Sequence, residues 1–220
     1  MSIKINLNKV DLSSISGLMI DIDDTLYNYS KPNDFAIKTC FEHLRKANLI
    51  QSIKLEEFKT LYVKKRKLIT KKLNPQGVCR SRQFAFDSLF RDLDISQAYL
   101  KANKYEKIYW DAFLQVMEAS KEMSDFVKKA KKHGLIICAV TDMQASFQIA
   151  KLKKLGLSRY FDYLASSEEA GAEKPNQKIF KLALEKMQLT KSQVVMIGDN
   201  KIKDIQGAQS FGIKTIHFKA

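Results

Sequence analysis

Cysteine is scarce in this chain, and its few copies follow no regular spacing. The three residues, Cys40, Cys79 and Cys138, are odd in number and far apart in the sequence. Small secreted domains stapled by disulfides and structural zinc sites both need cysteines at close, regular spacings. Both classes are therefore disfavoured, and we expect a protein of a reducing compartment, the cytoplasm.

Long apolar runs are lacking as well. The longest clean run, residues 135–140, is far shorter than the roughly 20 residues that span a bilayer. Residues 1–6 also lack the apolar segment of a signal peptide. We expect a soluble protein with no membrane partner, and 45% hydrophobic residues in a chain of 220 suffice for a sizeable core.

Acidic residues are outnumbered by basic ones. The net charge of +14 indicates an anionic partner, such as a phosphorylated metabolite, a nucleic acid or a membrane surface. The excess is concentrated in residues 31–111, which hold 18 Lys and Arg against 9 Asp and Glu. Most of these are lysines at helical spacings, including Lys71 and Lys72. This pattern favours a solvated, lysine-rich surface over a nucleic-acid site.

One acidic stretch near the N-terminus differs from its surroundings. Residues 18–20 form a short apolar run typical of a buried strand, and Asp21, Asp23 and Asp24 follow it. Carboxylates this close repel one another, so a cation, basic groups or solvent must offset their charge. Because ligands bind at strand ends in open α/β folds, the stretch indicates a divalent-metal and phosphoryl site. The alternative is an acidic turn in solvent.

The hydrophobic pattern changes twice along the chain. Residues 30–116 carry apolar residues at helical spacing and no convincing strand, which predicts an all-helical segment. Beyond it, helices alternate with short apolar strands, so we expect β-α-β units and a parallel sheet. We predict two domains, an α/β core of residues 1–29 and 117–220 and an inserted helical domain of residues 30–116.

Further predicted strands also end in polar residues. Thr141 and Asp142 follow one apolar run, and Asp199 follows another. If the strands are parallel neighbours, their carboxyl ends converge on one crevice together with Asp21. Lys174 lies in a loop between two of these strands.

These residues occur in the order of four motifs, and the chain resembles the phosphohydrolases of the haloacid dehalogenase superfamily. The matching segments are D-I-D-D-T-L at residues 21–26, Thr141, Lys174 with Pro175, and G-D-N-K-I-K-D at residues 198–204. The helical insertion after the first motif resembles the C1 cap of subfamily I. The resemblance implies a Rossmannoid core with a parallel sheet and an inserted all-helical cap.

By resemblance, the chemistry is a Mg²⁺-dependent phosphatase reaction through an aspartyl-phosphate. Asp21 would be the nucleophile, and Asp23 would protonate the leaving oxygen and then activate water. Mg²⁺, which prefers oxygen ligands, would bind the Asp21 carboxylate, the Asp23 backbone carbonyl and Asp199.

The same resemblance assigns the phosphate and its supporting groups. Thr141, Asp142 and Lys174 would hold the phosphate oxygens. Thr25 and Asp204 would contact the residues that bind phosphate and metal without binding the substrate themselves. Asp204 would orient Lys174 or a metal-bound water. Asp142 departs from the family pattern, in which Asn is common, and this affects local hydrogen bonding.

Two arginines of the helical domain are candidates for substrate selection. In related capped phosphatases an arginine near this point reaches toward the leaving group of the substrate. The planar fork of arginine binds carboxylate or phosphate through two hydrogen bonds. Arg82 lies nearer the predicted helix start than Arg80 and is the preferred candidate. The alternative is that both are exposed surface residues.

The substrate is expected to be a small anionic phosphorylated metabolite: a sugar phosphate, a phosphoglycolate-like acid or a nucleoside monophosphate.

Other functions stay open as alternatives. A phosphomutase shares the core residues. A 2-haloacid dehalogenase is a further alternative, although that branch generally lacks an acid at the position of Asp23. A phospho-accepting receiver domain would lack the helical insertion. A basic nucleic-acid-binding protein with an inactive core is opposed by four intact motifs. The expected assembly is a monomer or homodimer.

Overall fold

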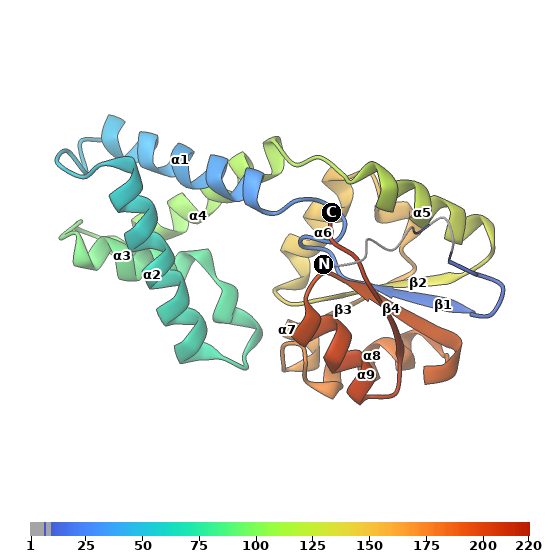
Figure 1. Ribbon diagram of the computed structural model, residues 1–220. Coiled ribbons are helices and arrows are strands. Elements are labelled where there is room, and N and C mark those ends of the chain that lie inside the picture. Colours follow the sequence, from blue (N-terminus) through green and yellow to red (C-terminus); the bar gives the residue numbers. More distant parts are fainter. Residues whose placement is uncertain (1–6, 8–9) are drawn as a thin grey trace. The chain divides into compact units, whose positions relative to one another are not determined.

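A parallel β-sheet lies at the centre of one part of the chain (Figure 1). The computed structural model describes residue 7 and residues 10–220, and within them the sheet has five strands in the order β3-β2-β1-β4-β5. The strands are β1 (Gly17–Ile20), β2 (Ile136–Thr141), β3 (Tyr163–Ser166), β4 (Val194–Gly198) and β5 (Lys214–His217). Met19 of the central strand lies opposite Cys138 and Met196 of its two parallel neighbours. The carboxyl ends of β1, β2 and β4 consequently meet at one edge of the sheet.

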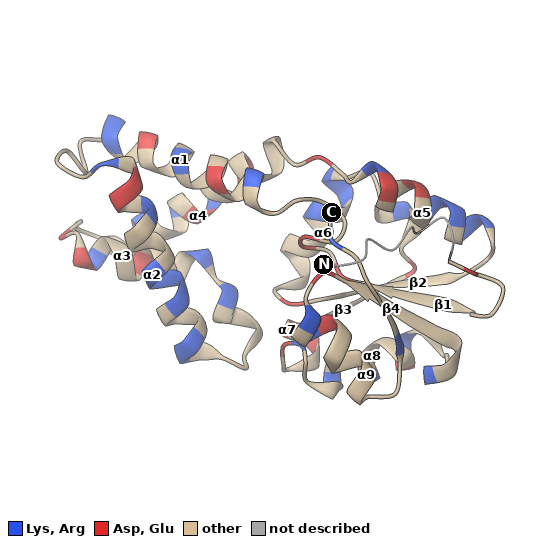
Figure 2. Cartoon of the chain, in the orientation of Figure 1, with Lys and Arg blue, Asp and Glu red and all other residues tan. Residues whose placement is uncertain are grey.

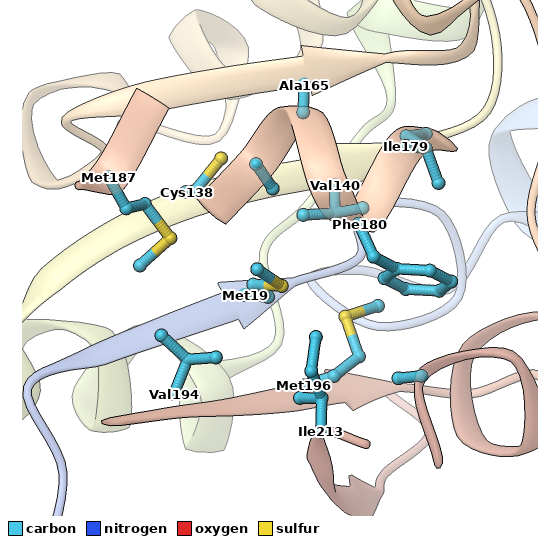
Figure 3. Close-up of a cluster of buried hydrophobic side chains, with 12 residues drawn as sticks. Met19, Cys138, Val140, Ala165, Ile179, Phe180, Met187, Val194, Met196 and Ile213 are labelled. Carbon is cyan, nitrogen blue, oxygen red and sulfur yellow. The ribbon is translucent and has the colours of Figure 1, made fainter. Parts of the chain in front are cut away.

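The inner strands are buried on both faces, which explains why their sequences are continuous apolar runs. Every residue of β1 and of β4 is buried. Figure 3 shows the packing on one face, where Met19 and Met196 lie near Phe180 and Met187 of α8 (Gln177–Met187). Burial of this apolar surface fixes the strands, and with them the polar residues at their carboxyl ends.

Helices cover both faces of the sheet. Figure 1 shows α5 (Lys121–Lys132) and α6 (Ala145–Lys154) on one face, and α8 and α9 (Gly207–Ser210) on the other. Shorter segments complete the connections: η3 (Ser158–Tyr160), α7 (Ser167–Ala170), η4 (Lys191–Gln193) and the π-helical turn η5 (Lys201–Gln206). The predicted α/β core with a parallel sheet is therefore confirmed.

A second compact unit is built from helices. This helical unit comprises residues 30–74 and 78–117, and the other described residues form the core unit around the sheet. Its segments are α1 (Ser30–Lys46), α2 (Leu55–Leu73), α3 (Arg82–Asp92) and α4 (Ala98–Gln115), while η2 (Gly77–Arg80) joins α2 to α3. Aromatic rings fill its interior: the ring centroids of Tyr62 and Phe86 are 5.0 Å apart, and those of Phe90 and Tyr105 are 5.3 Å apart.

Basic side chains lie on the surface of the helical unit. Figure 2 shows Lys and Arg along α2, where Lys64, Lys67, Lys71 and Lys72 are exposed, as expected of a solvated helix face. Along the described part of the chain, no helix combines the length and the apolar character needed to cross a membrane.

Candidate active site

Asp21 is the first residue after the central strand and is buried. Its backbone N–H donates to the carbonyl oxygen of Ile197 at 2.9 Å, which continues the β1–β4 pairing by one residue. Its Oδ1 lies 2.5 Å from Lys174 Nζ, and its Oδ2 accepts the Thr25 hydroxyl at 3.4 Å. Burial raises the pKa of Asp21 well above its ordinary value, against the attraction of Lys174 and with added repulsion from neighbouring acids. Strand pairing, burial and one ammonium group thus fix this carboxylate.

Lys174 is the cation at the centre of the site. Its Nζ lies 2.5 Å from Asp21, 2.7 Å from Asp204 Oδ1 and 2.9 Å from the carbonyl oxygen of Val140. Burial lowers the pKa of Lys174, but the charges of Asp204, Asp21 and Asp142 outweigh burial and raise the pKa above its usual range. Lys174 is therefore charged at neutral pH.

Three carboxylates meet beside Lys174. Asp21, Asp199 and Asp204 each place an oxygen within 4.8 Å of the other two. Burial raises the pKa of Asp199 to about 6, and repulsion from Asp204 and Asp24 adds to this shift. Lys174 contacts Asp21 and Asp204 of this group, and hard carboxylate oxygens are the donors that Mg²⁺ prefers. The residues fit a divalent cation, with Asp204 as a third carboxylate beside the predicted Asp21 and Asp199.

Asp204 needs a glycine opposite it. A Cβ at Gly198 would lie 2.4 Å from the carboxyl carbon of Asp204, so no other residue fits there without displacing that side chain. Asp204 Oδ2 accepts the backbone N–H of Asn200 at 2.9 Å. The fourth motif therefore places its second acid against Lys174 through close packing on the end of β4.

Thr141 and Asp142 occupy the end of β2. The Thr141 hydroxyl oxygen accepts Gln148 Nε2 at 2.7 Å. The Asp142 carboxylate accepts the backbone N–H of Lys174 at 2.8 Å and lies 2.6 Å from Lys203 Nζ. Asp142, which stands where Asn is common in the family, is thus paired with the cationic Lys203, and this pairing explains why a carboxylate is accommodated here. A carboxylate has no proton to donate, so only the backbone N–H of Asp142 can donate to a phosphate.

The residue after Asp142 is held in an unusual conformation. Met143 has a φ of 112°, in a region that residues other than glycine rarely adopt. Its backbone N–H donates to the Ser167 hydroxyl at 2.7 Å. Backbone conformations of this kind gather at functional sites, where the surroundings compensate for them.

Asp23 has a different set of partners from Asp21. Its Oδ1 lies 2.6 Å from Lys151 Nζ and accepts the Tyr27 hydroxyl, while its Oδ2 accepts Gln148 Nε2 at 3.3 Å. Burial raises the pKa of Asp23, but the charge and hydrogen bond of Lys151 and the bonds from Tyr27 and Gln148 hold it below its ordinary value. Lys151 and Gln148 belong to none of the four motifs and were not predicted as site residues. The available signal was two polar residues, three positions apart, on the face of α6 that also carries the buried Leu152.

Both candidate specificity arginines belong to the helical unit. Arg82 is 2% exposed, and its guanidinium carbon lies 5.2 Å and 5.1 Å from the ring centroids of Tyr109 and Trp110. Its Nη1 donates to the carbonyl oxygen of Arg80 at 2.7 Å. The alternative that both arginines are exposed surface residues is therefore wrong for Arg82, which aromatic rings sequester. A role for Arg82 and Arg80 in substrate selection stays a prediction.

Known proteins resemble this chain along most of its length. The sequence model of the haloacid dehalogenase-like hydrolases matches residues 18–218. The ribulose-1,5-bisphosphate 5-phosphatase of Halopiger xanaduensis is 28% identical over 203 residues, which cover 92% of this chain and 84% of that protein. The glyceraldehyde 3-phosphate phosphatase of Pyrococcus furiosus is 29% identical over 209 residues, which cover 93% of this chain and 81% of that protein.

A solved structure shares the fold. The crystal structure of 2-haloacid dehalogenase from Pseudomonas syringae pv. Tomato DC3000 superposes with a TM-score of 0.74 and covers 92% of this chain and 86% of its own. The two sequences are 21% identical, so the likeness concerns the architecture alone.

Proposed function

The chain belongs to the haloacid dehalogenase-like hydrolase family, and from that premise we propose that it is a Mg²⁺-dependent phosphatase of small sugar phosphates that acts through an aspartyl-phosphate. One observation carries this proposal. A buried carboxylate, Asp21, lies at the end of the central strand next to the ammonium of Lys174 and to two further acids, Asp199 and Asp204. This arrangement suits attack by a fixed nucleophile on a phosphorus whose charged oxygens need both a cation and an ammonium group.

The reaction has two steps. In the first, an Asp21 oxygen bonds to phosphorus, the bond to the leaving oxygen breaks, and Asp23 donates its proton to that oxygen. In the second, water attacks phosphorus while Asp23 takes its proton, and the Asp21–phosphate bond breaks to release phosphate. The pairing of Asp23 with Lys151 favours the carboxylate form that the second step requires. A phosphoryl group bound nearby would raise the pKa of Asp23 and so favour the protonated form that the first step requires.

The remaining residues hold the phosphoryl group and the cation. Lys174, the Thr141 hydroxyl and the backbone N–H of Asp142 would donate to phosphoryl oxygens. Asp21, Asp199 and the backbone carbonyl of Asp23 would bind Mg²⁺, which neutralises charge on the phosphoryl group when bound. In this proposal Thr25 supports Asp21.

Of the two roles expected for Asp204, its contacts favour the orientation of Lys174 over that of a metal-bound water. Its Oδ1 is 2.7 Å from Lys174 Nζ, and its Oδ2 accepts a backbone N–H. We therefore propose that Asp204 orients Lys174 and adds negative charge near the bound Mg²⁺.

The relatives narrow the substrate class. The two phosphatases named above act on ribulose 1,5-bisphosphate and glyceraldehyde 3-phosphate, both of which are phosphorylated sugars. We therefore place a sugar phosphate ahead of a phosphoglycolate-like acid or a nucleoside monophosphate. Asp23 favours a phosphatase over a dehalogenase, because a halide leaving group needs no proton donor.

The test is a release assay for inorganic phosphate. Purified protein is incubated with phosphorylated three- to six-carbon sugars, phosphoglycolate and nucleoside monophosphates, in Mg²⁺ or in EDTA. We expect turnover of one or more sugar phosphates that is lost in EDTA and restored by Mg²⁺. The absence of turnover on every phosphate ester would overturn the phosphatase assignment, and equal rates in EDTA would overturn the metal requirement. Interconversion of sugar phosphates without phosphate release would identify a mutase.

A further inference from the structure

Helix α6 presents two fully buried polar side chains to the catalytic edge of the sheet. Gln148 and Lys151 are each 0% exposed and lie three residues apart, which places them on the same side of the helix. Burial of an ammonium or an amide is unfavourable unless each polar group finds a partner. The partners in this case are residues of the first and second motifs.

The charge of Lys151 is directed at Asp23. Its Nζ lies 2.6 Å from Asp23 Oδ1. The same Nζ lies 6.0 Å and 5.9 Å from the ring centroids of Tyr27 and Tyr29, within the range of cation–π attraction. The ammonium is therefore held by two aromatic rings and one carboxylate. Because Lys151 is fully buried, its contact with Asp23 holds that carboxylate away from solvent.

Gln148 links Asp23 to Thr141. Its amide nitrogen lies 2.7 Å from Thr141 Oγ1, 2.9 Å from the carbonyl oxygen of Asp142 and 3.3 Å from Asp23 Oδ2. A hydroxyl whose oxygen already accepts one hydrogen bond still has its own proton to donate. Gln148 therefore fixes the position of that hydroxyl, whose own proton makes only a long hydrogen bond, 3.4 Å to the carbonyl oxygen of Asp142, that a phosphoryl oxygen can replace.

We propose that Gln148 and Lys151 are positioning residues of this enzyme, which together fix the Asp23 carboxylate and the Thr141 hydroxyl for reaction. The inference rests on the proposed function, because it assumes that Asp23 transfers protons. The Asp23 side chain is 31% exposed, so without the charge of Lys151 only the hydrogen bonds from Tyr27 and Gln148 would keep it from rotating toward water. Small misplacements of a reacting group lower rates steeply, since the geometry of attack is narrow. The pair therefore acts on turnover more than on substrate binding.

The first measurement compares two matched variants of α6. Lys151→Met removes the ammonium and keeps most of the side-chain volume, whereas Lys153→Met makes the same change at an exposed position of the helix. With a hydrolysed sugar phosphate at saturating Mg²⁺, we expect Lys151→Met to lower kcat by roughly 10–100-fold and to change KM by less than about threefold. Lys151→Arg should recover part of kcat, and Lys153→Met should behave as the wild type. An unchanged kcat in Lys151→Met overturns the inference.

The second measurement separates positioning from support of the fold. In an Asp23→Asn background, with p-nitrophenyl phosphate as substrate, Lys151→Met should cause little further loss, because the group that it positions is already disabled. A residue that merely supports the fold would lower the rate by the same factor in both backgrounds, and its variant would lower Tm. Either of these results contradicts the inference.

A crystal structure of Lys151→Met tests the contact without reference to turnover. We expect the Asp23 carboxylate to leave its position or to occupy several rotamers, while β1 and α6 stay in place. If the wild type hydrolyses no phosphate ester but Asp23 moves in the variant, the proposed function fails and the positioning contact stands. If the wild type is active, and the Lys151→Met variant keeps both the position of Asp23 and the wild-type kcat, the inference fails and the proposed function stands.

Discussion

The two units of this protein both bury apolar side chains but differ in how they bury charged ones. In the core unit, Asp21, Lys174, Asp204 and Lys151 all lie below the surface at the carboxyl edge of the sheet. In the helical unit, aromatic rings form much of the interior, among them Phe86, which packs against Tyr62, Phe90, Tyr105 and Tyr109. The buried Arg82 lies against two aromatic rings of this unit and is not part of a cluster of charges.

The difference separates function from stability. A buried ion pair is a weak source of stability, because desolvation of both charges offsets their attraction. Burial of aromatic rings stabilises the fold directly, because it removes apolar surface from water and brings the rings into contact with one another. A cluster of buried charges at a strand end therefore marks a chemical site, and an aromatic interior marks a structural one.

The largest expected effect comes from removal of the buried nucleophile. Asp21→Asn should lower phosphate release by more than about 10³-fold, because the amide cannot form the phosphoenzyme. It should leave Tm unchanged or raise it, since the substitution removes a desolvated charge and Lys174 keeps Asp204. Phosphate release and thermal unfolding followed by circular dichroism check both outcomes. Near-normal hydrolysis would contradict the covalent mechanism, and a large loss of Tm would contradict the contrast between the units.

The second expected effect lies in the helical unit. Phe86→Ala should lower the free energy of unfolding by about 3–5 kcal/mol, because a fully buried ring leaves a cavity among its neighbours. Phe35→Ala is the matched control, since Phe35 belongs to the same unit and is 38% exposed, and its cost should be much smaller. Urea denaturation measures both. Similar losses at the two positions would show that the aromatic interior is not what stabilises the unit.

The third effect decides whether the helical unit also contributes to recognition. Arg82→Ala should lower kcat/KM for the preferred sugar phosphate by roughly 10–100-fold if its guanidinium binds a group of the substrate. Hydrolysis of p-nitrophenyl phosphate, which lacks such a group, should barely change. Arg91→Ala on the exposed side of α3 is the control, and its side chain is 66% exposed. Equal losses on both substrates, or a loss of Tm alone, would assign Arg82 to the aromatic packing of the unit.

The smallest effect is a pH dependence of stability in the core unit. The pKa of Asp199 is about 6 in the folded protein against an ordinary value of 3.8, so the unfolded state loses its proton first as the pH rises. Without metal, the contribution of Asp199 to stability should therefore fall between about pH 4 and pH 6 and stay lower above. In EDTA, the Tm of Asp199→Asn minus the Tm of the wild type should therefore increase as the pH rises over this range. Added Mg²⁺ should stabilise the wild type above pH 6. If the Tm of the wild type instead gained on that of Asp199→Asn as the pH rises in EDTA, basic groups of the protein would already stabilise the Asp199 carboxylate.

Much of the core unit was predictable because its signals are local. Short apolar runs alternate with helical patterns, and this alternation is sufficient to predict a parallel sheet. Asp21, Thr141 and Asp199 each follow such a run, so their common location needs only the rule that parallel strands end at one edge. The motif resemblance then supplied the order of these residues and their expected roles.

Contacts between distant segments could not be predicted from local sequence patterns. Gln148 reaches Asp23 across 125 residues of sequence, and Lys203 reaches Asp142 across 61. In each case a helix residue meets a strand-end residue at a point set by the packing of the whole sheet. Arg82 shows the same limit, since its burial over Tyr109 and Trp110 depends on how α3 packs against α4.

The sequence by itself therefore determined the fold class, the helical insertion, the acids at the strand ends and the lysine in the loop between two strands, because each depends on composition and spacing within one element or on motif order. Only the tertiary structure decided which charges are paired. Asp21 is paired with Lys174 and Asp23 with Lys151, and Asp142 is held by Lys203. The physical reason is that a buried charge must find its partner wherever the packed elements provide one, and no local pattern encodes that position.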